Sequence, residues 1–229
     1  MPIRTKKMDD WIDYYDSTHT IYVSKLHRDV HFRVIANDIL AYVPSPDAVV
    51  LDYSCGEAFF AAQVAAACQK LVLAEPAPGV RGRLTARFGP NPKIVVRSLD
   101  ELAQLPDQST DLAVMISVAQ YMTAAELEGA FALMRRILKP GGQIIIHTAP
   151  NRWYDAYAYP IVRQLRRLMG QGAKYPSNPR ALNVAINTEV HVNEQDILRM
   201  RAFLKRAQFH GIRVWLLSLI HISEPTRPY

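Results

Sequence analysis

Short apolar runs alternate with helical stretches along the first two thirds of the chain. Five of the runs are rich in Val, Ile, Leu or Ala and are bounded by polar or glycine-containing turns, which predicts buried strands. These strands span 48–52, 71–75, 93–97, 111–117 and 143–147. Helical spacing of apolar residues, or alanine-rich composition, predicts helices over 23–43, 59–69 and 124–138.

This alternation predicts an α/β fold with a doubly wound, mostly parallel sheet. In such a sheet, ligands bind beyond the carboxyl ends of the strands, at the point where the strand order reverses. Two of the predicted strands end in an acid, Asp52 and Glu75. We therefore expect the functional residues directly after the strands.

The composition is that of one ordinary globular domain. Of the 229 residues, 49 % are hydrophobic and 21 % are charged. The N-terminus lacks the apolar core of a secretory signal, and no apolar run is long enough to cross a bilayer. Cys55 and Cys68 are too few for a disulfide framework or a metal-ligand set. We therefore expect a reduced, cytoplasmic protein.

A metal site is not expected. His27 and His31 are four residues apart and would share one helix face, a spacing that permits a metal pair. No third ligand accompanies them, so polar residues on a partly exposed helix are the favoured interpretation.

Four motifs follow one another over residues 48–150. The first, Val50-Leu-Asp-Tyr-Ser-Cys-Gly56-Glu57, is an apolar strand, an acid and a glycine turn. The other three are Glu75, Leu105-Pro-Asp-Gln-Ser-Thr-Asp111 and Leu138-Lys-Pro-Gly-Gly142. Each motif is weak alone, but together and in this order they resemble those of class I S-adenosylmethionine-dependent methyltransferases. Ser54 and Ala58 stand where that family often has glycine.

The resemblance implies S-adenosyl-L-methionine as the cofactor. Asp52, Ser54 and Gly56 would line its amino-acid end, where a residue without Cβ allows close approach. Glu75 would accept hydrogen bonds from the ribose hydroxyls. The remaining contacts would be Ser98 and Leu99 at the adenine, with Ser117, Val118 and Tyr121 around the methyl group. Loop packing stays open for Ser98, Leu99 and Val118, as does a helix cap or surface acid for Asp52 and Glu75.

A nicotinamide dinucleotide is the alternative cofactor for this fold. Its binding turn is G-x-G-x-x-G, and only one of these glycines, Gly56, is present. The neighbouring Glu57 would repel a pyrophosphate. Methyl transfer is therefore favoured.

Two further segments are expected to complete the site. Residues 1–47 would form an N-terminal lid and helix, in which related enzymes often have a Tyr-rich segment that folds over the cofactor. Within a domain spanning 48–216, residues 152–192 would form an insertion on the acceptor side.

The insertion is strongly basic. Between Arg152 and Arg180 it has six basic residues against one acid, and a helix from Pro160 would place Arg163 and two further arginines opposite an apolar face. Such a face favours a phosphorylated or carboxylated acceptor. RNA, an anionic membrane surface and a merely solvated helix face are the alternatives.

Methyl transfer depends mainly on proximity and orientation, but an oxygen or protonated nitrogen acceptor also needs a base. Histidine suits that role at neutral pH, which makes His147 and His191 the candidate bases. Tyr154, Tyr157 and Arg163 are the candidate acceptor contacts.

The C-terminal end carries a further resemblance. Residues 217–227 resemble a translated sequencing adapter, so 217–229 is expected to be a non-native tail. A helix over 194–208, capped by Asn193 with Asp196 three residues later, would precede a sixth strand at 211–216. The family's seventh strand would then be missing.

The prediction is a class I methyltransferase that acts on a small, anionic acceptor. A non-catalytic cofactor-binding or scaffold protein of the same fold is the first alternative, because the first turn is degenerate. An RNA methyltransferase is the second. It is less favoured, because Ser117-Val-Ala-Gln-Tyr121 stands where many amino-methylating enzymes of nucleic acids have Asn/Asp-Pro-Pro-Tyr.

Overall fold

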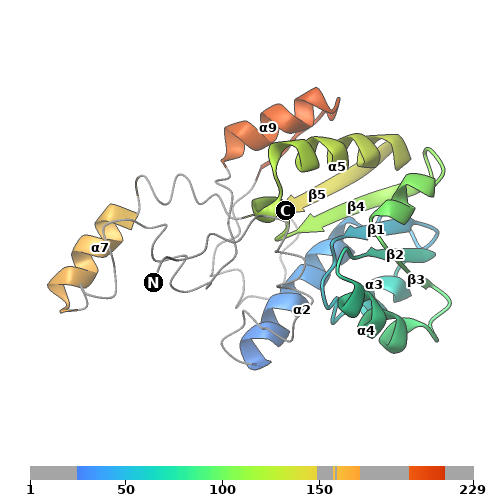
Figure 1. The fold of residues 1–229 in the computed structure, drawn as a ribbon, viewed down its shortest axis with the longest axis horizontal. Coiled ribbons are helices and arrows are strands. Elements are labelled where there is room, and N and C mark those ends of the chain that lie inside the picture. The colour runs from blue at the N-terminus through green and yellow to red at the C-terminus, as the bar shows by residue number, and fades with distance from the viewer. Residues whose placement is uncertain (1–24, 149–156, 158, 171–195, 215–229) are drawn as a thin grey trace, which may run out of the picture.

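A computed structural model of the chain describes residues 25–148, 157, 159–170 and 196–214. Five parallel strands form one sheet in the order β3-β2-β1-β4-β5 (Figure 1). The strands are β1 Val49–Tyr53, β2 Lys70–Ala74, β3 Ile94–Arg97, β4 Thr110–Ile116 and β5 Leu138–His147. The order reverses between β1 and β4, which confirms the predicted doubly wound sheet.

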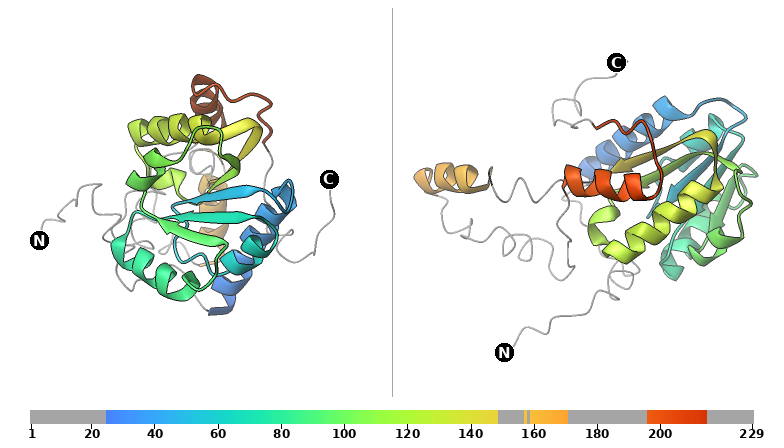
Figure 2. Two further views of the ribbon diagram at one scale, coloured as in Figure 1. Left: turned by 90° about the vertical axis from the view of Figure 1, so that its right-hand side faces the viewer. Right: turned by 90° about the horizontal axis from the view of Figure 1, so that it is seen from above.

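Helices cover both faces of the sheet (Figures 1 and 2). One face carries α2 Lys25–Tyr42, α3 Ala61–Ala66 and α4 Pro78–Phe88, and the other carries α5 Ala124–Ile137 and α9 Ile197–Arg206. Two 3-10 helices, η1 Asp100–Gln104 and η2 Ala119–Tyr121, follow β3 and β4. The helix α7 Tyr159–Leu168 stands apart from these layers in both figures.

The core lies in two layers because successive strand residues point to opposite faces. Val50 and Val114 pack under α2, α3 and α4, whereas Leu51 and Met115 pack under α5 and α9. All four are fully buried. The continuous apolar runs in the sequence are explained by burial on both faces.

The helix starts show one correction. Asn193 with Asp196 was the predicted N-cap pair of the last helix. Asp196 is itself the N-cap of α9, because its carboxylate accepts a 2.7 Å hydrogen bond from the N–H of Arg199. Asn193 lies outside the described residues.

The Leu138–Gly142 turn is part of β5 rather than a loop ahead of it. Thr110 pairs with Leu138 and Leu112 with Gln143, so β5 contains an irregular bulge opposite Asp111. The Asp111 carboxylate accepts a 2.8 Å hydrogen bond from the N–H of Val49 and binds the Lys139 ammonium at 2.8 Å. These contacts tie the amino ends of three neighbouring strands together.

The sixth strand predicted at 211–216 does not form over 211–214, the part of it that the structure describes. Residues 211–214 form no strand, and Gly211 has a φ of +64°. Phe209 and Ile212 instead pack against the core under α9, so side-chain burial rather than strand pairing holds this segment. Residues 215–229, including the adapter-like sequence, lie outside the described part of the chain.

Candidate functional site

The loop after β1 has an unusual backbone. Ser54, Gly56 and Ala58 have φ values of +56°, +55° and +41°. Only glycine adopts this left-handed region without steric cost, and other residues lose roughly 1–2 kcal/mol there. Ser54 and Ala58 therefore keep the glycine-type conformation of the motif although they are not glycines.

Glu75, directly after β2, holds this loop in place. Its side chain is buried, with 4 % of the residue exposed, and Oε2 accepts a 2.8 Å hydrogen bond from the N–H of Gly56. Oε1 accepts a 2.9 Å hydrogen bond from the N–H of Ala77. Burial raises the pKa of Glu75, although these two hydrogen bonds oppose the rise. A carboxylate has about four acceptor positions, so two remain for a ligand.

Two polar groups beside Glu75 have no hydrogen-bond partner within the described part of the chain. Asp52 accepts no hydrogen bond from any described residue, and burial, with the Glu75 charge adding to it, raises its pKa to about 7. The Ser54 hydroxyl is buried without a hydrogen-bond partner in the described chain. A Cβ built on Gly56 would meet nothing within 4 Å. Unsatisfied polar groups beside open space fit a bound polar ligand.

Glu57 turns away from this space. Its carboxylate accepts hydrogen bonds from Arg83 Nε at 2.9 Å and Arg87 Nη2 at 3.1 Å, both on α4. Its charge is therefore not directed at a ligand beside Gly56. The case against a dinucleotide rests on the missing glycines rather than on repulsion by Glu57.

Ser98 and Leu99 connect β3 to η1. The Ser98 N–H donates a 2.6 Å hydrogen bond to Glu101 Oε2, and the Ser98 hydroxyl accepts a 3.3 Å hydrogen bond from the Glu101 N–H. Leu99 packs against the core under α5 and α9. These contacts account for both residues as loop structure, and adenine binding stays a prediction.

The ends of β4 and β5 bring Ser117 and His147 together. The Ser117 hydroxyl lies 3.2 Å from His147 Nδ1, and the Ser117 N–H donates a 2.8 Å hydrogen bond to the His147 carbonyl. Ser117 has a φ of +55°. Burial lowers the pKa of His147, and nearby Asp38 of α2 opposes this to a smaller extent. A neutral imidazole can accept a proton.

Further side chains extend this corner. Gln120 Nε2 donates a 2.9 Å hydrogen bond to the Ser117 carbonyl, and the Thr148 hydroxyl donates a 3.2 Å hydrogen bond to Gln120 Oε1. Val118 is buried in the core, whereas Tyr121 in η2 is partly exposed. Core packing therefore accounts for Val118.

The predicted acceptor residues are not gathered at this corner. Tyr157 is 69 % exposed, and Arg163 lies on α7, apart from the strands (Figures 1 and 2). Tyr154 and His191 lie outside the described residues, as does the N-terminal Tyr-rich segment.

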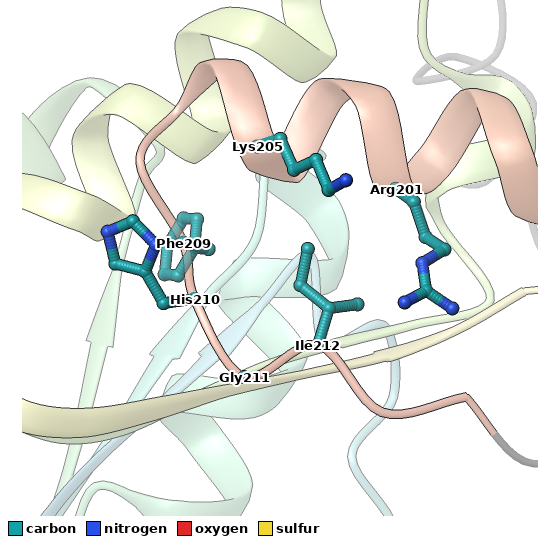
Figure 3. A pocket seen from close by; sticks show the side chains of 6 residues that line it. All are labelled: Arg201, Lys205, Phe209, His210, Gly211 and Ile212. Atoms are coloured by element: carbon teal, nitrogen blue, oxygen red, sulfur yellow. The ribbon is translucent and has the colours of Figure 1, made fainter.

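A cavity of about 420 Å³ lies elsewhere, between α9 and the segment after it (Figure 3). The cavity is lined by Arg201, Lys205, Phe209, His210, Gly211 and Ile212. None of the predicted site residues belongs to it. We therefore place the candidate site at the carboxyl ends of β1, β2 and β4, not here.

Sequence reasoning missed two parts of the site. The Ser117–His147 contact had a signal, because the carboxyl ends of adjacent parallel strands lie side by side and Ile116 pairs with His147. No sequence signal placed Asp38 near His147, because the way α2 crosses the sheet cannot be deduced from the sequence of the helix.

Comparisons with known proteins agree with this fold. Residues 51–146 match a family described as a methyltransferase domain. No curated protein matches the chain. An S-adenosylmethionine-dependent methyltransferase from Mesorhizobium loti has a TM-score of 0.54 and 17 % identity, over 76 % of this chain and 78 % of that one.

Two other solved structures have similar scores. Phosphoethanolamine N-methyltransferase 1 from Haemonchus contortus, bound to phosphoethanolamine and S-adenosylhomocysteine, has a TM-score of 0.51 and 17 % identity over 60 % of this chain. The match spans only 31 % of that enzyme's chain. A chain from the Haloferax volcanii complex of the Trm112 methyltransferase activator and a candidate methyltransferase has a TM-score of 0.54 and 17 % identity, covering 90 % of this chain and 77 % of that one. Likeness at these identities shows a shared fold.

Proposed function

We propose that the chain is a class I S-adenosylmethionine-dependent methyltransferase, since residues 51–146 match a methyltransferase-domain family, and that it methylates a small, anionic acceptor. The observation that carries the proposal is the set of polar groups where the strand order reverses. Among the residues that the structure describes, Asp52 and the Ser54 hydroxyl have no hydrogen-bond partner there, and Glu75 holds the Gly56 loop beside them.

The residues present fit the cofactor. The Asp52 carboxylate would pair with the ammonium group of its amino-acid end, and the Ser54 hydroxyl would gain a partner. The open space at Gly56 allows close approach of a ligand to the backbone. The two free acceptor positions of Glu75 would bind the ribose hydroxyls. When bound, the cofactor supplies a methyl group on a sulfonium.

We assign the role of base to His147. With Nδ1 protonated and donating to the Ser117 hydroxyl, Nε2 carries the lone pair. Nε2 would take the proton of an acceptor O–H or N–H, so that the acceptor atom is free to receive the methyl group that the bound cofactor would supply. The lowered pKa of His147 keeps the imidazole neutral for this step at pH 7. His191 remains a second candidate base.

The charge of the acceptor is inferred from the basic insertion. The sequence predicts that Arg163, with Tyr154 and Tyr157, contacts a phosphate or carboxylate group. Arg163 lies on α7, apart from the strand ends (Figure 1), so the basic insertion supports the charge of the acceptor and not a contact with it. The Haemonchus contortus enzyme is named for phosphoethanolamine, a small phosphorylated acceptor. Its likeness concerns the fold, so phosphorylated amines and alcohols are a class to screen, with carboxylated acceptors beside them.

The first test is calorimetric titration with S-adenosylmethionine. We expect binding by the unaltered chain and a 10- to 100-fold loss in Asp52→Asn, because a hydrogen bond to a charged group contributes about 1.5–3 kcal/mol. Glu128→Gln is the control, since Glu128 is exposed on α5 and bonds only to Arg206 among the described residues.

The outcomes separate the candidates. Equal affinity of Asp52→Asn and the unaltered chain would remove Asp52 from the cofactor site. No binding by a well-folded chain would favour the non-catalytic scaffold of the same fold. After binding is shown, mass spectrometry of phosphorylated acceptors beside their uncharged analogues tests the acceptor class. Equal methylation of both members of each pair would contradict the anionic assignment.

A further inference from the structure

The helix α7 is amphipathic, and its apolar side takes no part in the candidate methyl-transfer site. At 100° per residue, Ile161, Leu165 and Leu168 fall on one side. Arg166 and Arg167 fall on the other side, with Arg163 between them around the helix axis. Residues 159–168 contain no acid.

The apolar side of this helix faces outward. Ile161, Leu165 and Leu168 are 64 %, 55 % and 77 % exposed, and Met169, just after the helix, is 59 % exposed. With Tyr157, five of the nine large exposed apolar residues in the described chain fall within thirteen consecutive positions. Folded monomers rarely leave a patch of this kind uncovered.

We propose that α7 is an interfacial helix that lies flat on an anionic lipid surface. Its apolar side would enter the boundary between headgroups and acyl chains, while its arginines stay at the level of the lipid phosphates. The charge of the helix, three arginines and no acid, complements that surface.

The dimensions exclude a spanning arrangement for α7. Ten residues of helix extend about 15 Å, about half of a hydrocarbon core. Within the described parts of the chain, no helix has the length and apolar character to cross a membrane. The helix therefore has the features of a surface binder.

The test is flotation of the full chain with two kinds of vesicle, phosphatidylcholine alone and phosphatidylcholine mixed with phosphatidylglycerol. We expect binding to the mixed vesicles only, and weaker binding at high salt. Arg166→Gln/Arg167→Gln should bind about 25-fold more weakly, since each arginine near an anionic surface contributes roughly fivefold. This pair leaves out Arg163, which the acceptor proposal uses.

Matched variants separate the helix from general charge and hydrophobicity. Arg201→Gln/Lys205→Gln removes the same charge from α9 and should bind normally. Leu165→Gln/Leu168→Gln should abolish binding, whereas Leu26→Gln/Leu198→Gln, at residues 74 % and 66 % exposed, should not. Circular dichroism would verify that each variant is folded.

Three results would overturn the proposal. The first is equal binding to neutral and anionic vesicles, or binding to neither. The second is equal loss in the α7 variants and their controls. The third is a change of oligomeric state in Leu165→Gln/Leu168→Gln, measured by light scattering, with vesicle binding unchanged. That result would assign the apolar side to contacts between copies of the chain. Cofactor titration is a separate readout, so failure here leaves the methyltransferase proposal intact.

Discussion

Asp52 is expected to make the folded chain less stable as the pH rises. Burial and the Glu75 charge raise its pKa to about 7, from an ordinary value of 3.8. Between these values the folded state holds a proton that the unfolded state has released. The free energy of unfolding therefore falls with rising pH in this window, by up to ~1.4 kcal/mol per pH unit. The full effect is about 4 kcal/mol at pH 7 and above.

The perturbation that tests this is Asp52→Asn, which keeps the shape of the side chain but cannot ionise. The variant should be more stable than the unaltered chain by up to about 4 kcal/mol at pH 8, with the difference vanishing near pH 4. Urea unfolding at several pH values measures the free energy of unfolding directly. Asp47→Asn, at an exposed position just before β1, is the matched control.

Parallel curves for Asp52→Asn and the unaltered chain from pH 4 to pH 8 would refute this reasoning. A second measurement links the same group to the cofactor. If ionised Asp52 pairs with the cofactor's ammonium, affinity should fall up to tenfold for each pH unit below 7. A stability effect without this binding effect would leave Asp52 as a half-buried acid outside the cofactor site.

Three further predictions concern the strained loop after β1, the candidate base His147 and the Asp111 carboxylate that links three strands. Ser54→Gly/Ala58→Gly should raise the free energy of unfolding by about 1 kcal/mol, because relief of positive-φ strain exceeds the entropic cost of glycine. Urea unfolding measures this, and a lower free energy of unfolding would contradict it. The lowered pKa of His147 means that stability falls as pH drops below 6.5, and His147→Asn should flatten that slope in thermal unfolding. Asp111→Asn should cost about 1 kcal/mol, since Lys139 and a backbone N–H of β1 lose a charged acceptor; Lys139→Gln combined with it should add little.

The strands were predictable because they are buried on both faces. Each predicted run lies within two residues of its observed start and end, except that β5 begins five residues early, at Leu138. The helix α4 was missed. Its buried residues Val80, Leu84 and Phe88 have the correct spacing of four, but Gly79 just before them and Gly82 between them weaken the helical pattern. That spacing of apolar residues was the sequence signal from which α4 could have been predicted.

The site was predictable only in outline. The positions of Asp52 and Glu75 followed from the strand ends, because acids after buried strands must lie at the sheet's carboxyl edge. The hydrogen bond from Gly56 to Glu75 did not follow, because it depends on how two separate loops meet. Nor did the predicted sixth strand form over 211–214, since strand formation depends on a partner edge that local sequence does not specify.

The distribution of backbone strain supports the same location for the site without using any motif. In the described chain, five residues other than glycine have positive φ, and two of them, Ser54 and Ser117, directly follow β1 and β4. These are the two strands between which the order reverses. Such strain persists only where surrounding structure enforces it, and it collects at functional sites. The substitution of serine for glycine at position 54 therefore need not mark a lost function. The conformation is kept, and the serine adds a buried hydroxyl that a bound ligand would satisfy.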